Sequence, residues 1–440
     1  MNGEPRFFGH PGGLSTLFFT EMWERFSYYG MRAFLILYMV HALGFDDKHA
    51  GSVYGNYTAG VWAAAIVGGI IADRWLGQYR SVLFGGIIIA LGHFTLAFHP
   101  LPFFYVGLSL IVIGTGLLKP NVSGIVGALY DPTDTRRDAG FSIFYMGINL
   151  GAFIGPLIAG WLAQKVDWHL GFACAGVGMS LGLLQYVLGR RSLQPAIDRL
   201  AHQPKPVATT SVTPAPAGGF LGFTATEWKR IGAMGVFFVF AAIFWGAYEQ
   251  AGSSLNLFGD RYTTLRILGF SFPSSWYVSV QAIFVILLAP AFAWLWIRLG
   301  KYEPTTPTKF AFGLLFVGLS FLFLLIPANA IQGAAGGGLR VSPFWLVGCY
   351  FIQELGEMCI SPVGLSVFTK LAPVKIVGMM LGLWFLADSV GNKVAGYAAG
   401  FISSAPLPQL FGVVGAVCVG ASLIAFAIVK PVKQLMGGVR

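Results

Sequence analysis

The sequence predicts an all-α integral membrane protein in which twelve helices cross the bilayer as two sets of six. Hydrophobic residues make up 56% of the 440 residues and charged residues only 10%, with a mean hydropathy of +0.70. Charged residues are near a quarter of a typical soluble protein, so a soluble fold is excluded. Apolar runs of about 20 residues, the length that spans a bilayer core, recur along the chain.

The first six apolar runs are separated by short polar breaks. They cover residues 14–41, 50–75, 79–98, 102–130, 139–163 and 169–189. The preceding segment is short, polar and interrupted by Pro5 and Pro11, so we expect no cleaved signal peptide. The first run is therefore treated as a retained helix.

Residues 190–227 separate the two sets of apolar runs. This segment is rich in proline and polar residues and contains no run that could span a membrane. It predicts a cytoplasmic linker between an N-terminal six-helix bundle, residues 1–189, and a C-terminal six-helix bundle, residues 228–440. The runs of the second bundle cover residues 228–250, 275–298, 308–328, 343–370, 376–402 and 409–430.

The distribution of basic residues predicts the orientation in the membrane. If both termini are cytoplasmic, 19 of the 28 lysines and arginines lie in inner segments and 5 in outer loops. The net charge of +10 then reflects membrane topology, and we expect no nucleic-acid binding. The four cysteines lie within apolar runs, so neither a disulfide nor a metal cluster is expected.

Ten charged residues remain inside the predicted spans. The four bases are Arg25, Arg32, Lys119 and Lys393, and the six acids are Glu21, Glu24, Glu249, Glu354, Glu357 and Asp388. Each costs roughly 2.5–3.5 kcal/mol at a helix centre unless it faces a partner or water, so they predict a polar interior. Mutual pairing that only fixes helix packing is one interpretation. The surplus of acids favours a second one, since an unpaired buried acid can hold a proton near neutral pH.

Several motifs resemble those of the proton-dependent oligopeptide transporters, a branch of the major facilitator superfamily. The two most specific are EMWERFSYYG (21–30), similar to the family's ExxER-F-x-YYG signature, and FSIFYMGINLGAFIGP (141–156), similar to FYxxINxG. Further similar stretches are GGIIADRWLG (68–77), TGLLKPNVSGIVG (115–127), FWGAYEQAGS (244–253), ISPVGLSVFTKLAP (360–373) and LWFLADSVGN (383–392).

The resemblance implies a proton-coupled symporter that imports di- and tripeptides. It implies the major facilitator fold, with two six-helix bundles around a central cavity, in the inner membrane of a bacterium. No cofactor is expected apart from the coupled protons, and the expected assembly is a monomer. Many bacterial relatives have two extra helices between the bundles, for which residues 190–227 leave no room.

The resemblance also assigns peptide-binding roles. A dipeptide presents its carboxylate and ammonium at fixed positions whatever its side chains are, so a promiscuous site should bind those groups. Arg32 and Lys119 would bind the carboxylate and Glu357 the ammonium. Neutral hydrogen-bonding groups would be Tyr29, Tyr145, Asn149 and Gln281. The cavity walls would include Trp62, Trp245 and Trp384, for which ordinary aromatic packing is the alternative. Trp62 and Gln281 stand where relatives often have tyrosine and asparagine.

Proton coupling and gating follow from the same resemblance. Glu249 would pair with Arg32 as an outer gate that protonation opens. A second exchange network would consist of Glu21, Glu24, Arg25 and Lys119. Asp73 and Arg74 would latch cytoplasmic helix ends, with a solvated charge pair as the alternative. For Glu354, Asp388 and Lys393 we expect structural contacts between helices.

Two other classes of function remain open at this stage. A membrane-embedded enzyme is disfavoured, because the sequence contains no HExxH, no GxSxG and no cluster of histidines. A transporter of the same fold could instead carry another small zwitterion, an anion such as nitrate, an amino acid or a drug. A purely anionic substrate would leave Glu357 without a purpose.

Overall fold

The computed structural model describes residues 6–131, 133–202, 222–334, 338–373 and 376–438. Its first part is helical apart from one short hairpin. The helices are α1 (Gly13–His41), α2 (Asp47–Ile71), α3 (Gln78–Leu96), α4 (Leu101–Ala128), α5 (Arg137–Gly155), α6 (Trp161–Lys165), α7 (Trp168–Leu188) and α8 (Arg190–His202). The antiparallel hairpin before α1 pairs β1 (Arg6–Phe7) with β2 (His10–Pro11).

The second part has the same character. Its helices are α9 (Ala225–Tyr248), α10 (Ser254–Tyr262), α11 (Tyr277–Leu299), α12 (Thr306–Phe323), α13 (Leu325–Gly333), α14 (Phe344–Leu371), α15 (Val377–Ala399), α16 (Leu407–Ala427) and α17 (Val429–Leu435). A second antiparallel hairpin, β3 (Arg266–Ile267) with β4 (Phe270–Ser271), lies between α10 and α11.

Polar residues mark where several long helices begin. Asp46 and Asp167 accept hydrogen bonds from the first turns of α2 and α7, and Thr224 forms a reciprocal capping box at the start of α9. Such caps satisfy backbone N–H groups that have no partner within the helix. The apolar runs therefore begin as helices at the polar breaks that separate them.

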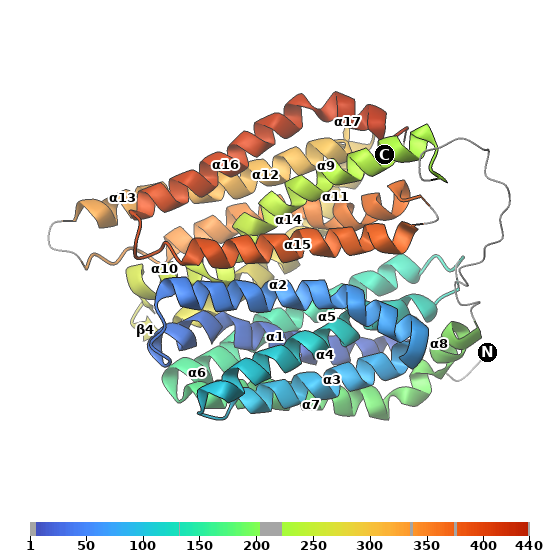
Figure 1. Ribbon diagram of the computed structural model, residues 1–440, viewed down its shortest axis with the longest axis horizontal. Coiled ribbons are helices and arrows are strands. Elements are labelled where there is room, and N and C mark those ends of the chain that lie inside the picture. Colours follow the sequence, from blue (N-terminus) through green and yellow to red (C-terminus); the bar gives the residue numbers. More distant parts are fainter. Residues whose placement is uncertain (1–5, 132, 203–221, 335–337, 374–375, 439–440) are drawn as a thin grey trace.

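The helices form two groups that lie side by side (Figure 1). Helices α1 to α7 occupy one half, and helices α9 to α17 occupy the other. The halves meet where α2 packs against α15 and where α5 packs against α11. In Figure 1, α8 and α17 lie at one end of the bundle, and α6 and α13 lie at the opposite end.

Every apolar run predicted from the sequence is covered mainly by helices, although runs 308–328 and 409–430 each contain a helix break, at Leu324 and Ile428. Two further features differ from the prediction. Residues 190–202 form helix α8, although the prediction made them part of a linker. The run predicted to end at residue 250 continues through a short 3₁₀ turn, Glu249–Gly252, into α10. The sequence did not indicate α10, because polar residues end the apolar run where the 3₁₀ turn interrupts the helix.

The distribution of side chains is that of a membrane protein. In the described ranges, nine helical segments are long and apolar enough to cross a bilayer. The other three predicted spans are α1, α14 and α15, helices of 29, 28 and 23 residues that carry five of the six buried acids. Large apolar side chains on outer helices are exposed, as in Leu91, Leu184 and Leu287, whereas Glu24 and Glu354 are fully buried. Charges inside and apolar groups outside suit a lipid environment.

Hydrogen bonds between the two halves extend from the middle of the helices to the end at which α6 and α13 lie. Arg261 of α10 binds Asp47 of α2 through two bonds of 2.6 and 2.8 Å, and Asn256 Nδ2 donates to the carbonyl of Ala33 at 2.7 Å. Ser279 of α11 donates to the carbonyl of Phe153 at 2.8 Å. Within the described ranges, no hydrogen bond or ion pair joins the halves at the end of α8 and α17. The described hydrogen bonds between the halves therefore lie in the middle of the molecule and at the end that bears α6 and α13.

Candidate functional site

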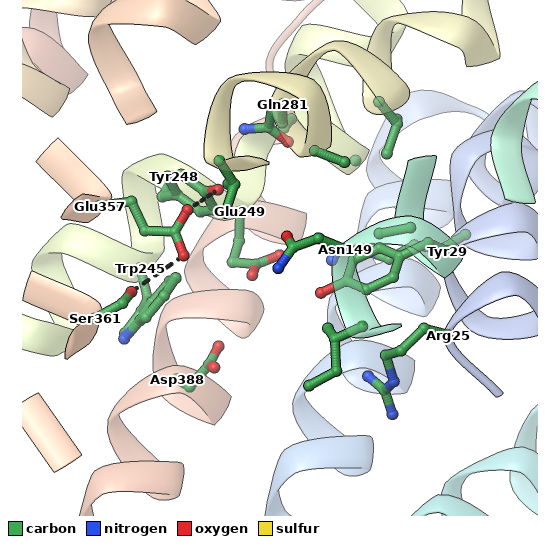
Figure 2. Close-up of a pocket in the computed structure, with 18 of the residues that line it drawn as sticks. Arg25, Tyr29, Asn149, Trp245, Tyr248, Glu249, Gln281, Glu357, Ser361 and Asp388 are labelled. Carbon is green, nitrogen blue, oxygen red and sulfur yellow. Dashed lines mark hydrogen bonds and ion pairs between the residues drawn. The ribbon is translucent and has the colours of Figure 1, made fainter. Parts of the chain in front are cut away.

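A cavity of about 310 Å³ lies between the two halves. Helices α1, α2, α4 and α5 line it from the first half, and α9, α11, α14 and α15 line it from the second. All ten predicted peptide-binding residues lie on its wall: Tyr29, Arg32, Trp62, Lys119, Tyr145, Asn149, Trp245, Gln281, Glu357 and Trp384. Figure 2 shows Arg25, Tyr29 and Asn149 across the cavity from Trp245 and Glu357.

A buried ion cluster on α1 forms part of the wall. Arg25 Nε lies 3.2 Å from Glu21 Oε1 and also pairs with Glu24, and all three side chains are almost fully buried. Glu21 and Arg25 line the cavity, whereas Glu24 does not. α5 approaches closely because Gly151 faces α1, where a Cβ atom would lie 2.9 Å from the Cβ of Arg25. Removing Arg25 would leave two buried carboxylates without a counter-ion.

An ion pair across the cavity joins α1 to the 3₁₀ turn after α9. Arg32 Nη2 donates to Glu249 Oε2, and Arg32 Nε donates to Tyr54 Oη at 2.6 Å. Gly252, the last residue of that turn, makes room for this contact, since a Cβ atom there would collide with the Tyr54 hydroxyl oxygen. The predicted pair of Arg32 and Glu249 is therefore present in the structure, and Tyr54 is a partner that the sequence did not indicate.

On the opposite wall, two carboxyl groups of α14 converge on one tyrosine of α9. Tyr248 Oη lies 2.7 Å from Glu357 Oε2 and 2.8 Å from Glu354 Oε1. Glu357 also accepts a hydrogen bond from Ser361 Oγ at 3.1 Å (Figure 2). Glu357 lines the cavity, but Glu354 lies behind it and is fully buried. The expected contact between helices is thus present for Glu354, between α14 and α9.

Lys119 lies against an aromatic stack. Its Nζ is 3.2 Å from the ring centroid of Trp62, and Trp62 stacks on Phe385 of α15 at a centroid distance of 6.0 Å. No carboxylate in the described part of the chain lies within 4.0 Å of Lys119 Nζ. The predicted network of Glu21, Glu24, Arg25 and Lys119 is therefore divided in this structure. Three members pair with each other, and Lys119 makes a cation–π contact instead.

Asp388 and Lys393, which share α15, have separate environments. Asp388 lines the cavity and accepts a hydrogen bond from Asn392 Nδ2 at 2.7 Å. Lys393 is exposed and donates to Asn56 of α2. The expected contact between helices is present for Lys393, whereas Asp388 lines the cavity and forms its hydrogen bond within its own helix.

The remaining predicted groups complete the wall. Asn149 Nδ2 donates to the carbonyl of Tyr145 at 3.0 Å, and Gln281 Nε2 donates to Gln353 Oε1 at 3.3 Å. The ring of Tyr29 lies 5.9 Å from the guanidinium carbon of Arg32. These side chains supply neutral hydrogen-bonding groups between the charged ones.

Trp245 and Trp384 reach the cavity and also pack in the second half. Trp245 contacts Phe244 edge to face at 5.2 Å, and Trp384 contacts Phe368 at 5.5 Å. Each of these two side chains therefore lines the cavity and also packs against a neighbouring aromatic ring.

Asp73 and Arg74 lie away from the cavity, in the exposed turn that follows α2. Asp73 Oδ1 accepts a hydrogen bond from Gln78 Nε2 at 3.1 Å, and the Arg74 guanidinium lies over the ring of Trp75 at 5.8 Å. In the described ranges neither residue forms an ion pair. The latch between helix ends is not formed in this structure and stays a prediction.

The charges in the cavity define what it can bind. Arg25 and Arg32 already have carboxylate partners. Within the described ranges, Lys119 of the first half, and Glu357 and Asp388 of the second, have no ion-pair partner. A cation on one half and anions on the other can bind a small molecule that carries both charges at separate ends.

Comparison with known proteins gives matches over almost the whole chain. A sequence model described as the POT family matches residues 79–200 and 223–415. The chain is 37% identical, over 99% of both chains, to a protein of Lactococcus lactis subsp. cremoris named a di-/tripeptide transporter. It is 36% identical to the peptide transporter YePEPT of Yersinia enterocolitica, over 99% of this chain and 97% of that protein.

Solved structures give the same picture. A crystal structure of a peptide transporter POT in complex with sulfate superimposes with a TM-score of 0.89 at 41% identity, over 99% of this chain and 98% of that one. A mutant peptide transporter POT in complex with alafosfalin gives a TM-score of 0.87 at 42% identity, with the same coverage.

Proposed function

Because the chain belongs to the POT family, we propose that it is a proton-coupled symporter that imports di- and tripeptides by alternating access. It would do so as twelve spanning helices in the major facilitator arrangement, with an N-terminal bundle (1–189), a linker and a C-terminal bundle (228–440). The observation that carries the proposal is the placement of Lys119 and Glu357 on opposite halves of one cavity, each without an ion-pair partner within the described ranges.

Peptide binding would use the charges that every dipeptide shares. The carboxylate would displace Lys119 from the face of Trp62 and bind it, and the ammonium would bind Glu357. Arg32 would join the carboxylate once Glu249 releases it. A ligand held by both halves stabilises the state in which they are close, so binding would favour closure around the peptide.

The gate would be the pair of Arg32 and Glu249. With both termini in the cytoplasm, the end that bears α6 and α13 faces outside, and the bonds between the halves close that end. A proton that reaches Glu249 from outside would neutralise it and weaken its attraction for Arg32. The outer end would then open, and Arg32 would become available to the peptide.

The other predicted elements would act when the inner end closes. A peptide carboxylate on Lys119 would add a negative charge near Glu21 and Glu24, which share Arg25. The second exchange network would respond to that charge. Asp73 and Arg74 would form their latch in the same state.

The substrate class is tested with dipeptides that lack one charged end. We propose to measure inhibition of labelled dialanine counterflow in proteoliposomes by dialanine, its N-acetyl derivative and its C-terminal amide. In the wild type, both derivatives should inhibit at least about thirtyfold more weakly than dialanine, because each leaves one cavity charge, on Lys119 or on Glu357, without a partner.

Two variants assign the ends of the peptide. Glu357→Gln should lose most of the preference for dialanine over the N-acetyl form, and Lys119→Gln most of the preference over the amide. Inhibition by nitrate or free alanine as strong as that by dialanine would instead favour another substrate of the same fold. Equal inhibition by all three dipeptide forms would refute the binding mode.

A further inference from the structure

The hydrogen atoms between Tyr248, Glu354 and Glu357 can be counted. A tyrosine hydroxyl has one hydrogen, and an ionised carboxylate is only an acceptor. Yet Tyr248 Oη lies 2.8 Å from Glu354 Oε1 and 2.7 Å from Glu357 Oε2, and both distances are those of full O–H···O hydrogen bonds. One hydroxyl hydrogen cannot fill both contacts. A second hydrogen must lie between these oxygens, and it belongs to one of the carboxyl groups.

The charges around the pair lead to the same count. The titratable groups that face Glu354 are Tyr248 of α9, Glu249 of the 3₁₀ turn after it, Tyr145 of α5 and Glu357 of α14 itself. Gln281 of α11 is neutral, Lys309 of α12 pairs with Glu303, and Asp388 of α15 binds Asn392. In the described ranges no lysine, arginine or histidine lies within 4.0 Å of Glu354 or Glu357. Two adjacent carboxylates with no cation beside them repel each other, and Glu354 is fully buried, so protonation of one of the two is favoured.

Burial decides which carboxyl group holds the hydrogen. Glu354 has no exposed surface, does not reach the cavity, and its Oε2 is buried without a hydrogen-bond partner in the described part of the chain. Glu357 lines the cavity and has Ser361 as a further donor. A charge is more favourable on the group with the second donor and the access to water.

We propose that Glu354 is a neutral carboxylic acid that keeps its proton throughout transport and positions the peptide's ammonium site. Its hydrogen is donated to Tyr248 Oη, and the Tyr248 hydrogen is donated to Glu357, which remains the ionised member of the pair and accepts the ammonium. This inference rests on the proposed function. It makes Glu354 a positioning residue that acts through Tyr248, distinct from Glu249, which would exchange its proton.

Infrared spectroscopy of the full-length protein in liposomes, without substrate at neutral pH, tests the protonation state. The wild-type spectrum minus that of Glu354→Gln should contain the C=O stretch of a protonated carboxylic acid. A carboxylate antisymmetric stretch in its place would mean that Glu354 is ionised and would overturn the proposal. This result does not depend on transport, so a wild type that fails to carry dipeptides would refute the proposed function and leave the assignment of Glu354 standing.

Two variants of Glu354 test the positioning role. Glu354→Gln keeps a donor for Tyr248 Oη, so the half-saturating dialanine concentration should stay within about twofold of the wild-type value. The pH at which uptake is half-maximal should be unchanged. Glu354→Met has a similar length and no donor, and the lost hydrogen bond should weaken dialanine binding about tenfold. The double variant Glu354→Met with Tyr248→Phe should bind dialanine only slightly more weakly than Glu354→Met alone, since both substitutions interrupt the same chain of hydrogen bonds.

Two outcomes would contradict the positioning role. If Glu354→Gln lost gradient-driven uptake and kept counterflow, Glu354 would release its proton during the cycle. If the Gln and Met variants were equally impaired, the donor hydrogen would have no part in binding.

Discussion

Replacing Glu249 by Gln should uncouple transport from the proton gradient. Gln has the shape of a protonated glutamate and cannot ionise, so the variant would resemble the protein with its proton permanently bound. The carboxylate is held by Arg32, and both side chains are nearly buried at the interface between the halves. The gate would therefore lose its sensitivity to pH while the peptide-binding groups remain.

The size of the effect follows from the burial of the pair. Removing one partner of a buried ion pair costs about 3–5 kcal/mol. Because Arg32 and Glu249 lie on different halves, that loss falls on the state in which the outer end is closed. At the lower limit, a loss of about 3 kcal/mol shifts the equilibrium between closed and open outer ends about a hundredfold.

Two measurements follow the two consequences. Gradient-driven uptake of labelled dialanine should fall to the level seen without a gradient, whereas counterflow exchange should be retained. Amide hydrogen exchange in α10, which packs at the closed end, should become faster in the variant by about a hundredfold. Glu249→Asp keeps a titratable group and is the matched control, which should retain some response to the gradient. Unimpaired driven uptake by Glu249→Gln would place the coupled proton elsewhere.

Three further variants probe other parts of the molecule. Gly147→Val should lower the free energy of unfolding by about 1–3 kcal/mol, and with it the melting temperature, because a Cβ there would lie 2.9 Å from the Phe18 carbonyl oxygen. An unchanged melting temperature would contradict the tight packing of α1 on α5. Asp388→Asn should weaken inhibition by a dipeptide with a basic side chain about three- to tenfold more than inhibition by dialanine, since the carboxylate faces the cavity. If inhibition by the two dipeptides weakened equally, Asp388 would have no part in selectivity. In the loop after α4, hydrogen bonds from the side chain and backbone of Arg136 lower the pKa of Asp134 from 3.8 to about 2. Any stabilisation from this depressed pKa is present above pH 4 and is lost as the pH falls towards 2. Asp134→Asn should therefore leave the pH profile of uptake unchanged between pH 5 and 8, and a shifted profile would contradict that.

The positions of the long helices could be predicted from the sequence because the bilayer imposes a length on each apolar run. Their polar extensions could not be predicted in the same way. α8 has only 13 residues and few apolar ones, and α10 follows a helix break at which glycine and serine end the apolar run. In both cases the helix depends on packing against its neighbours, which a count of apolar residues does not contain.

The charged part of the cavity could also be predicted, because ionisable residues inside spans need a polar environment. Arg32, Lys119 and Glu357 stand out from apolar surroundings for that reason. Tyr54 and Tyr248 do not, since tyrosines are common in apolar helices and only their contacts reveal a role. The contact of Lys119 with Trp62 depends on how α2 and α4 pack, so the sequence could name both residues without pairing them.

The most direct test of the account is uptake of labelled dialanine into proteoliposomes that contain the wild-type protein, with and without an inward proton gradient. We predict accumulation above the external concentration only when the gradient is present, and its loss when a protonophore collapses the gradient. Equal uptake in both conditions would contradict proton coupling. No uptake or counterflow of any di- or tripeptide would contradict the substrate class on which the rest depends.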